Sequence, residues 1–378
     1  MNAVPDDSSW EAFDAGTLAN AATAALRAYD PGHDLPALRA RFGRDIAELG
    51  SNENPLGPSP RAIEAMRNAL AETFRYPDPR GLALKTALAA HHGVGLDRIA
   101  LGNGSHELLI LLAQCFADPQ HSIVFSQFGF AVFPIATAVA GAIALRVPAL
   151  SRTHATAPFG HDVAAMAHAI RADTRIVYVA NPNNPTGTWF DDAALDRFAA
   201  SVPRDVLLVV DEAYGEYVDA PGLSGALRLA QRHPNLIVTR TFSKAYALAG
   251  LRVGYLIAHP SVVAVVERLR ESFNVNNVAL AAAEAALGDA AHLAKSKAWN
   301  AAERAWLADA LSSRGYRVLP SQTNFVLVDL GRDAAPFEKH LFDRGVIVRP
   351  MGGYGLGESV RISIGSREEN QRLLDALP

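Results

Sequence analysis

The sequence contains 378 residues with a formal net charge of −4 at pH 7, and 49% of its residues are hydrophobic and 20% charged. This balance is typical of a globular protein with a sizeable core, and the weak charge gives no global field that would favour nucleic acid or an acidic membrane. Residues 1–10 are polar and acidic, and no apolar run reaches the roughly 18–20 residues of a membrane span, so we expect neither a signal peptide nor a span and place the protein in the cytoplasm.

The first part of the chain predicts an arm followed by helices. We expect a helix around residues 18–27 within an N-terminal arm that ends near residue 50. A Pro/Gly-rich turn cluster follows, and its last residues, Ser59 and Pro60, start a helix that runs to about Phe74. Two further helices are expected at residues 80–90 and 106–116, the second of them buried.

The middle of the chain changes to short apolar runs rich in β-branched residues. The expected strands are residues 122–125, 142–147, 175–180, 206–210, 235–240 and 253–258. Helix-length segments, including residues 160–172 and 191–200, separate several of these runs. Continuous apolar strands that alternate with helices indicate a mostly parallel sheet covered by helices on both faces.

Beyond about residue 272 the pattern becomes α+β. A long Ala-rich helical stretch over residues 278–312 precedes four short strands and one more helix. The strands are expected at residues 316–319, 325–329, 346–349 and 360–364, and the helix at residues 335–344. We therefore predict an α/β fold with a large domain at 51–272, a smaller α+β domain at 273–378, and an arm at 1–50 that joins the small domain.

Polar side chains follow several of these strands, which matters because open α/β sheets bind ligands at the carboxyl ends of their strands. The segment Asn181-Pro-Asn-Asn-Pro-Thr-Gly187 presents asparagine amides at one such end, although a plain proline turn would also explain it. Asp211, Glu212 and Tyr214 follow the next apolar run. A carboxylate there is costly to bury unless it meets a cation, whereas the alternative reading is a helix N-cap.

Lys244 stands out because the chain has only five lysines. Four of them lie in polar, helix-like surroundings and are expected at the surface: Lys85, Lys295, Lys297 and Lys339. Lys244 instead lies in a mainly apolar stretch with Thr241, Ser243 and Arg252, whose donors suit a phosphate. A desolvated lysine beside other cations has a lowered pKa and becomes a usable amine nucleophile, although a solvent-exposed lysine is the simpler alternative.

Two further observations concern ligands. The turn Gly102-Asn-Gly-Ser-His106 leads into the predicted buried helix, and such helix starts offer free N–H groups to an anion. The twelve histidines show no metal-binding spacing, and His91-His92 is interpreted as a helix end. The one cysteine, Cys115, is expected to be a buried, inert thiol.

Taken together, the motifs resemble those of fold-type I aminotransferases that use pyridoxal 5'-phosphate (PLP), and within them the histidinol-phosphate aminotransferase family. The resemblance covers nearly the whole chain, from Asn52-Glu-Asn-Pro55 to Val360-Arg-Ile-Ser-Ile-Gly365, and the stretch from Thr241 to Gly254 is specific by itself. It implies a large domain with a mostly parallel sheet of the seven-stranded type and a smaller α+β domain.

The resemblance also implies residue roles. Lys244 would hold PLP as a Schiff base and later move a proton between the substrate Cα and the cofactor C4′ atom. Asp211 would pair with the pyridinium nitrogen, and Tyr214 and Asn184 would donate to the ring oxygen. The phosphate would be bound by Gly104, Ser105, His106, Thr241, Ser243 and Arg252, and by Tyr76 from a neighbouring subunit, which implies a homodimer. Phe128 corresponds to the aromatic residue that stacks on the ring.

On the substrate side, Arg361 corresponds to the arginine that grips the carboxylate of 2-oxoglutarate or glutamate, with Asn184 beside it. Arg349 is a second anion candidate, or else a surface arginine that ends a strand. Two positions depart from the family pattern. His106 replaces an acidic or amide residue, which puts any side-chain contact to the ring in doubt, and Phe128 replaces the common tyrosine, which loses a hydroxyl.

Four functions follow from this resemblance. The first is transamination of histidinol phosphate with 2-oxoglutarate in histidine biosynthesis, and the second is transamination of phenylalanine or tyrosine by the same motifs. A PLP decarboxylase keeps the cofactor and changes the reaction. A PLP-sensing regulator would carry a DNA-binding domain, and the roughly 50 residues before the first motif contain no basic helix-turn-helix.

Overall fold

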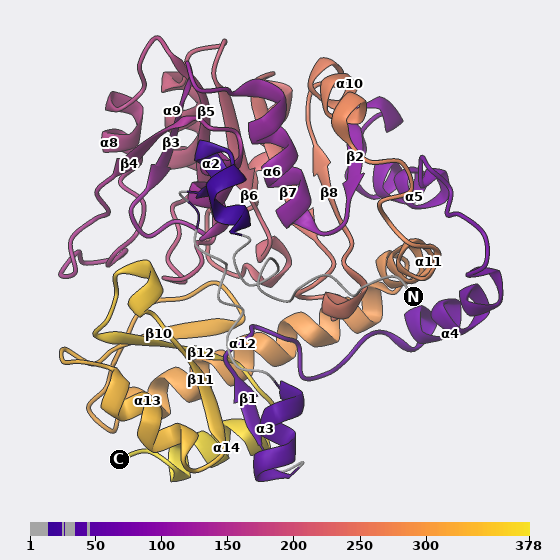
Figure 1. Ribbon diagram of the computed structural model, residues 1–378. Helices are drawn as coiled ribbons and strands as arrows, with labels where there is room; N and C mark the ends of the chain where they lie inside the picture. The colour runs from indigo at the N-terminus through magenta and orange to yellow at the C-terminus, as the bar shows by residue number, and fades with distance from the viewer. Residues whose placement is uncertain (1–13, 25, 27–34, 44–45) are drawn as a thin grey trace, which may run out of the picture.

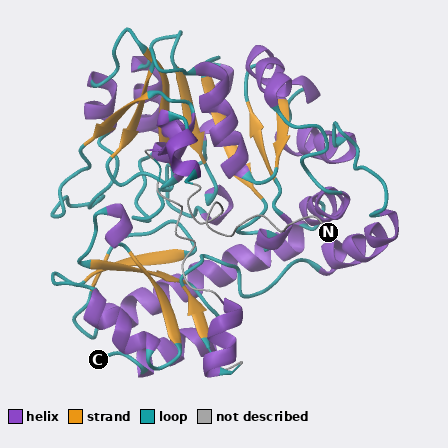
Figure 2. Ribbon diagram, in the orientation of Figure 1, coloured by secondary structure: helices purple, strands orange, loops and turns teal. Residues whose placement is uncertain are grey.

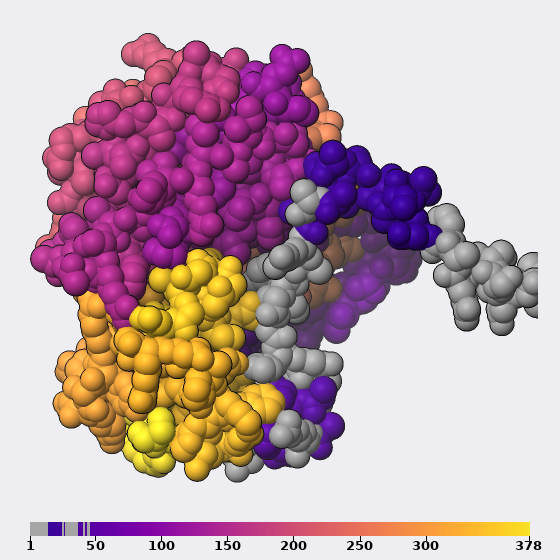
Figure 3. Space-filling view, turned by 60° about the vertical axis from the view of Figure 1, so that its left-hand side comes forward, coloured from indigo at the N-terminus to yellow at the C-terminus, as the bar shows by residue number. Residues whose placement is uncertain are grey.

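The computed structural model describes residues 14–24, 26, 35–43 and 46–378. It contains two sheets that lie one above the other, with helices around each (Figure 1). Figure 2 shows the strands of the larger sheet running side by side between layers of helix. In the space-filling view the C-terminal residues, in yellow, lie directly below the middle of the chain, in magenta (Figure 3).

The larger sheet has seven strands in the order β2-β8-β7-β6-β5-β3-β4, and only β8 runs antiparallel to its neighbours. The strands are β2 (Ile99–Gly102), β3 (Ser122–Ser126), β4 (Ile143–Val147), β5 (Thr174–Ala180), β6 (Leu207–Asp211), β7 (Leu236–Thr241) and β8 (Gly254–Ile257). The mostly parallel sheet predicted from the apolar runs is therefore confirmed. The four-residue strand β2 was not predicted.

Helices cover both faces of this sheet. One face packs against α6 (Ser105–Phe116), α7 (Val132–Val139) and α10 (Pro260–Leu269), and the other against α8 (Val163–His168) and α9 (Asp192–Ser201). Successive side chains of each inner strand point to opposite faces of the sheet. Tyr178 and Val209 therefore pack into one core, and Val179 and Val210 pack into the other. Burial on both faces explains why these strands contain uninterrupted apolar runs, such as residues 176–180 of β5.

A third core forms at the β2 edge. Here α4 (Pro60–Ala69), α5 (Leu82–His92) and α11 (Asn277–Leu287) pack together beside β2 and β8. The Ser59 hydroxyl accepts from the Ala62 N–H and Pro60 occupies the first turn, so α4 begins where the sequence predicts. The short 3-10 segment η2 (Leu70–Glu72) continues α4, and His91 and His92 end α5 as expected.

The smaller sheet has five strands in the order β1-β11-β12-β10-β9. Its strands are β1 (Ala47–Leu49), β9 (Arg317–Val318), β10 (Phe325–Asp329), β11 (Val346–Pro350) and β12 (Ser359–Ser363). The helices α12 (Ala290–Ser312), α13 (Ala335–Phe342) and α14 (Arg367–Asp375) pack on one face, and α3 (Leu35–Phe42) precedes β1. β1 pairs in parallel with β11, so a segment near the start of the chain completes a sheet from its end. The domain boundaries at residues 50 and 272 remain a prediction.

Several predicted elements need correction. The single helical stretch at 278–312 is two helices, α11 and α12, because the Asp289 carboxylate caps a new helix by accepting from the His292 N–H. The helix predicted at 160–172 is only the six residues of α8, which begins after its own N-cap, Asp162. The N-terminal helix is reduced to η1 (Ala15–Leu18) and α2 (Ala21–Ala24), and residues 25 and 27 of the predicted range lie outside the described residues.

Two side chains also differ from expectation. Lys85 is not a simple surface lysine, because its ammonium lies 3.8 Å from the Glu267 carboxylate and burial lowers its pKa. Cys115 is only half-buried, although burial still raises its pKa and so disfavours the reactive thiolate. Within the described residues no helix is long and apolar enough to cross a membrane.

Candidate active site

The predicted site residues converge on one cavity of about 280 Å³ at the carboxyl ends of the large sheet's parallel strands. Those that line it are Ser105, His106, Asn184, Asp211, Tyr214, Thr241, Ser243, Lys244, Arg252, Arg349 and Arg361. Three predicted residues do not line it: Gly104, Phe128 and Tyr76. The cavity also borders the segment from Gly50 to Glu53, so it lies between the two sheets.

Lys244 lies three residues after β7, half-buried in the cavity wall. Its Nζ donates to the main-chain carbonyl of Asn52 at 3.1 Å. Burial lowers the pKa of Lys244 to about 8, with further lowering by the positive charges of Arg361 and Arg252 and partial compensation by Glu53. The shift has the direction that the sequence predicts, and it gives the amine an appreciable neutral fraction near neutral pH.

Asp211 ends β6 and is only 3% exposed. Burial, followed by the neighbouring charge of Glu212, raises its pKa to about 7, although the Thr239 hydroxyl donates to Oδ1 at 2.8 Å. A carboxylate in this position is stabilised by a cationic partner, so a protonated ring nitrogen fits the chemistry of the site.

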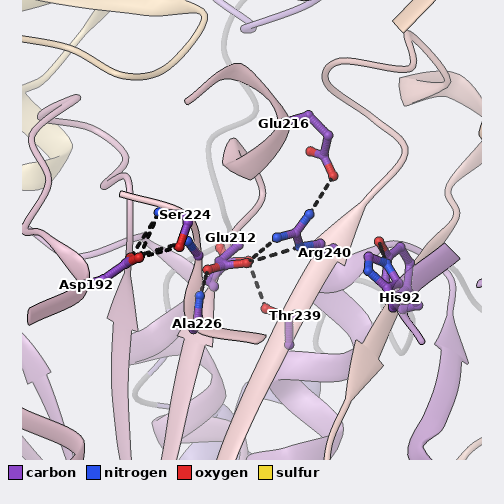
Figure 4. Close-up of polar contacts among 11 residues, drawn as sticks. His92, Asp192, Glu212, Glu216, Ser224, Ala226, Thr239 and Arg240 are labelled. Carbon is purple, nitrogen blue, oxygen red and sulfur yellow. Dashed lines mark hydrogen bonds and ion pairs between the residues drawn. The ribbon is translucent and has the colours of Figure 1, made fainter. Parts of the chain in front are cut away.

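The strand ends beneath Asp211 are tied together by a buried ion pair (Figure 4). Arg240 donates through Nη2 to the Glu212 carboxylate at 2.6 Å and contacts Glu216 at 3.3 Å. The other Glu212 oxygen accepts from the Ala226 N–H. Residues 212 and 240 adjoin Asp211 and Thr241 but point to the opposite side of the sheet, where they fix the spacing of β6 and β7.

Two long-range hydrogen bonds set the direction of the polar groups above Lys244. Arg361 Nη1 donates to Asn184 Oδ1 at 2.8 Å, which turns the NH₂ end of that amide toward other acceptors. Asn52 Nδ2 donates to the Tyr214 hydroxyl oxygen at 2.9 Å, which leaves the phenolic hydrogen to be donated elsewhere. Asn184 and Tyr214 are thus both oriented as donors, and their predicted contact with the ring oxygen of PLP stays a prediction.

At the other end of the cavity the donors suit a phosphate. The hydroxyls of Thr241 and Ser243 lie 2.9 Å apart, and Arg252 Nη1 contacts the Ser243 hydroxyl at 3.4 Å. The N-terminus of α6 supplies the N–H groups of Ser105 and His106. Gly104 is required here because its φ is +86° and an added Cβ would lie 2.6 Å from Arg252 Nη2. Hydroxyls, a guanidinium and a helix start form a cradle for a dianion.

His106, one of the two departures from the family pattern, lies in this cradle. Burial and the nearby positive charge of Arg252 lower its pKa, so the imidazole is neutral at neutral pH. It therefore adds no positive charge beside the phosphate. Any contact from its ring to the cofactor stays a prediction.

Arg361 and Arg349 bring two guanidinium groups to the same cavity. They face each other as register partners on β12 and β11, and both border the cavity. Arg361 is 7% exposed, and its Nη2 donates to the Gly50 carbonyl at 2.7 Å. This places Arg349 beside the site and favours the anion role over the surface-arginine alternative.

The remaining predictions are placed differently. Phe128 is buried against Leu327 and Met351, whereas Phe130 borders the cavity, so a stacking role of Phe128 stays a prediction. Tyr76 is 81% exposed and lies away from the cavity of its own chain.

The sequence assigned no role to Asn52 or Thr239, which orient Tyr214 and Asp211 by hydrogen bonds. Asn52 nevertheless belongs to the quoted motif Asn52-Glu-Asn-Pro55. Within the part of the chain that the structure describes, no group of histidine, cysteine and acidic residues could hold a metal ion.

Comparisons with known proteins agree with this arrangement. The family model for aminotransferase class I and II matches residues 44–377. Histidinol-phosphate aminotransferase 2 of Pseudomonas aeruginosa is 49% identical over 363 residues, 95% of this chain and 96% of that protein. Histidinol-phosphate aminotransferase 1 of Nitrosococcus oceani is 46% identical over 361 residues, with coverage of 95% and 96%. The crystal structure of histidinol-phosphate aminotransferase from Sinorhizobium meliloti in complex with pyridoxal 5'-phosphate has a TM-score of 0.84 at 33% identity and covers 95% and 96% of the two chains.

Proposed function

The chain belongs to the aminotransferase class I and II family, and from this membership we propose that it transfers the amino group of histidinol phosphate to 2-oxoglutarate with PLP as cofactor. The observation that carries the proposal is one cavity in which Lys244, with its lowered pKa, lies between a phosphate cradle and a pair of arginines. PLP, when bound, supplies an electron sink that makes the substrate Cα proton removable.

The chain's own residues would hold the cofactor by complementary contacts. Asp211 would face the ring nitrogen and keep it protonated, which relieves the unfavourable burial of the carboxylate. Asn184 and Tyr214 would donate to the ring oxygen, in the directions that Arg361 and Asn52 fix. The phosphate would bind the hydroxyls of Thr241 and Ser243, Arg252, and the main-chain N–H groups of Ser105 and His106 at the start of α6. The predicted donor Gly104 does not supply its own N–H, because that group donates to the Gly102 carbonyl at 2.8 Å.

Lys244 would act as the covalent anchor and as the proton carrier. A neutral amine accepts a proton from the substrate Cα and returns it at the cofactor C4′ atom, and a pKa of about 8 suits both transfers near neutral pH. Burial beside Arg361 and Arg252 is the physical cause of that match.

Substrate choice would depend on the arginine pair. Arg361 and Arg349 place two guanidinium groups on neighbouring strands, which suits the dianionic phosphate of histidinol phosphate as well as a carboxylate of 2-oxoglutarate. Phenylalanine and tyrosine offer one carboxylate and remain the competing donors. We also propose a cytoplasmic homodimer in which Tyr76, 81% exposed in one chain, reaches the phosphate of the neighbouring site.

Steady-state kinetics with 2-oxoglutarate as acceptor test the proposal. We expect a higher kcat/KM for histidinol phosphate than for phenylalanine or tyrosine, and Arg349→Gln should reduce it more for histidinol phosphate than for phenylalanine. A higher kcat/KM for phenylalanine would refute the assigned donor and leave the aminotransferase reaction intact. Release of carbon dioxide from phenylalanine or tyrosine without 2-oxoglutarate would instead indicate a decarboxylase.

A further inference from the structure

Residues 270–276 join α10 to α11, whose first residue is Asn277, and the segment 270–277 does not border the cavity. It lies at the β2 edge, where α11 packs against α4 and α5 (Figure 1). Four side chains of this segment nevertheless reach two parts of the chain assigned to the PLP phosphate. Arg270, Phe273 and Asn277 contact the 72–79 segment that carries Tyr76. Asn274 contacts Glu107 in the first turn of α6, and Glu107 in turn binds the turn that precedes the helix. No motif of the sequence identified these side chains.

The first connection runs to the turn before α6. The Glu107 carboxylate oxygen Oε2 accepts from the Asn103 main-chain N–H at 2.7 Å and from Asn274 Nδ2 at 2.6 Å. Arg270 Nη1 donates to Asn274 Oδ1 at 2.6 Å, which turns the donor end of the amide toward Glu107. One carboxylate thus fixes the turn that Gly104 completes, and Asn274 fixes the carboxylate.

The position of this turn controls the geometry of the phosphate cradle. Gly104 lies so close to Arg252 that an added Cβ would be 2.6 Å from Nη2. A shift of the 103–104 backbone therefore changes the distance between the N–H groups at the start of α6 and the guanidinium. Those two groups must bind the same phosphate, so the anchoring of the turn acts on phosphate affinity.

The second connection runs to Tyr76. Its ring stacks on Phe273 with 4.7 Å between centroids and 26° between planes. Phe273 has a φ of +65°, a left-handed conformation that bulky side chains disfavour and that marks a position held by its surroundings. The stack orients a tyrosine that is otherwise 81% exposed.

Hydrogen bonds secure the backbone of the same 72–79 segment. Asn277 Nδ2 donates to the carbonyls of Glu72 and Arg75 at 3.1 and 3.2 Å. Arg270 Nη2 donates to the Pro79 carbonyl at 2.8 Å. The exposed segment is therefore held at both ends in one conformation, which lowers the entropic cost of placing Tyr76 against a second subunit.

We propose that residues 270–277 form the positioning element of the phosphate grip: Asn274 acts through Glu107 on the chain's own cradle, and Phe273 and Asn277 act through Tyr76 on the neighbouring one. The inference rests on the proposed function, because it assumes that PLP binds here and that Tyr76 serves a second copy of this chain. None of these residues touches the reacting atoms.

The test compares PLP with pyridoxal, which lacks the phosphate. Holoenzyme is purified, freed of cofactor and titrated with either compound, and the dissociation constants are measured by absorbance of the lysine-bound form. Asn274→Ala should raise the dissociation constant of PLP about ten-fold and leave that of pyridoxal unchanged, since loss of a hydrogen bond to a charged group is of this size. Glu107→Gln keeps one acceptor oxygen and should have a smaller effect in the same direction, and it replaces Asn274→Ala if that variant does not fold. Ser272→Ala, an exposed residue of the same segment, is the matched control and should change neither constant.

A double-mutant cycle tests the Tyr76 connection. Asn277→Ala and Tyr76→Phe should each weaken PLP binding several-fold, and the double variant should be little worse than Tyr76→Phe alone. Additive effects would overturn this half of the proposal, and equal weakening of PLP and pyridoxal by Asn274→Ala would overturn the other half. Failure of the proposed function would look different from failure of this inference. In that case the unmodified protein would bind PLP no better than pyridoxal, and the absorbance of the bound cofactor would not depend on Lys244.

Discussion

Asp211→Asn should stabilise the cofactor-free protein against unfolding and lower its affinity for PLP. The pKa of Asp211 is raised from 3.8 to about 7, so the folded protein holds this proton more tightly than the unfolded chain. The associated stability is fully present below the unfolded value and is lost as pH rises through about 7. Between pH 5 and pH 8, the free energy of unfolding falls mainly over the two pH units from 5 to about 7, where the folded protein is still protonated and the unfolded chain is not. At 1.36 kcal/mol for each unit, ionised Asp211 lowers the free energy of unfolding by about 3 kcal/mol over this range.

Urea unfolding of the cofactor-free protein at pH 5 and pH 8 measures this difference. The stability of Asp211→Asn relative to the unmodified protein should rise by about 3 kcal/mol from pH 5 to pH 8, because the amide carries no charge to bury. With PLP bound, the unmodified protein should be more stable than Asp211→Asn, because the amide cannot pair with a protonated ring nitrogen.

Asp196→Asn is the matched control. Asp196 is partly exposed, and its pKa is lowered by a hydrogen bond from His233 and by Arg232. Its stabilising contribution is present above the unfolded pKa and lost as pH falls, so this substitution should destabilise the protein at pH 8. An equal effect of Asp211→Asn at both pH values would refute the burial argument.

Three further outcomes are expected. Lys244→Ala should leave the fold intact by circular dichroism and reduce transamination at least about 10⁴-fold, and borohydride should then fix no cofactor to the protein. In the unmodified protein the rate of PLP capture, followed by stopped-flow absorbance, should rise with pH and level off above about 8, where Lys244 is neutral, rather than continue to the range of an exposed lysine. Arg361→Lys should raise KM for 2-oxoglutarate about ten-fold or more in steady-state assays, because lysine cannot make the paired hydrogen bonds of a guanidinium.

The sequence predicts the large sheet well because its signals are local. The inner strands are built around short apolar runs, such as residues 207–210 of β6, and a polar residue such as Asp211 follows the run directly. The break between α11 and α12 is less visible, since Ala-rich sequence continues on both sides and only Asp289, a capping residue, marks the new helix. The strand β2 was missed because only three apolar residues, Ile99 to Leu101, precede Gly102, where the glycine-rich turn begins.

Side-chain direction in the site could not be predicted in the same way. The residue types at Asn184 and Tyr214 indicate donors and acceptors alike, and the direction is set by partners 177 and 162 positions away in the chain. Phe130 rather than Phe128 borders the cavity, a difference of two residues that depends on how the turn after β3 folds. A motif identifies the residue, whereas its orientation depends on contacts that only the folded chain contains.

Arg361 shows why such contacts matter for function. Its guanidinium is held by the Asn184 side chain on the large-sheet side of the cavity and by the Gly50 carbonyl next to β1 of the small sheet. The plane of the guanidinium is thereby fixed before an anion arrives, so binding does not have to order a long flexible side chain. The same contact fixes the Asn184 amide, which we propose faces the cofactor ring. An anion that pulled Arg361 out of this position would also disturb Asn184, so in the proposed site substrate binding and cofactor polarisation would both depend on one arginine.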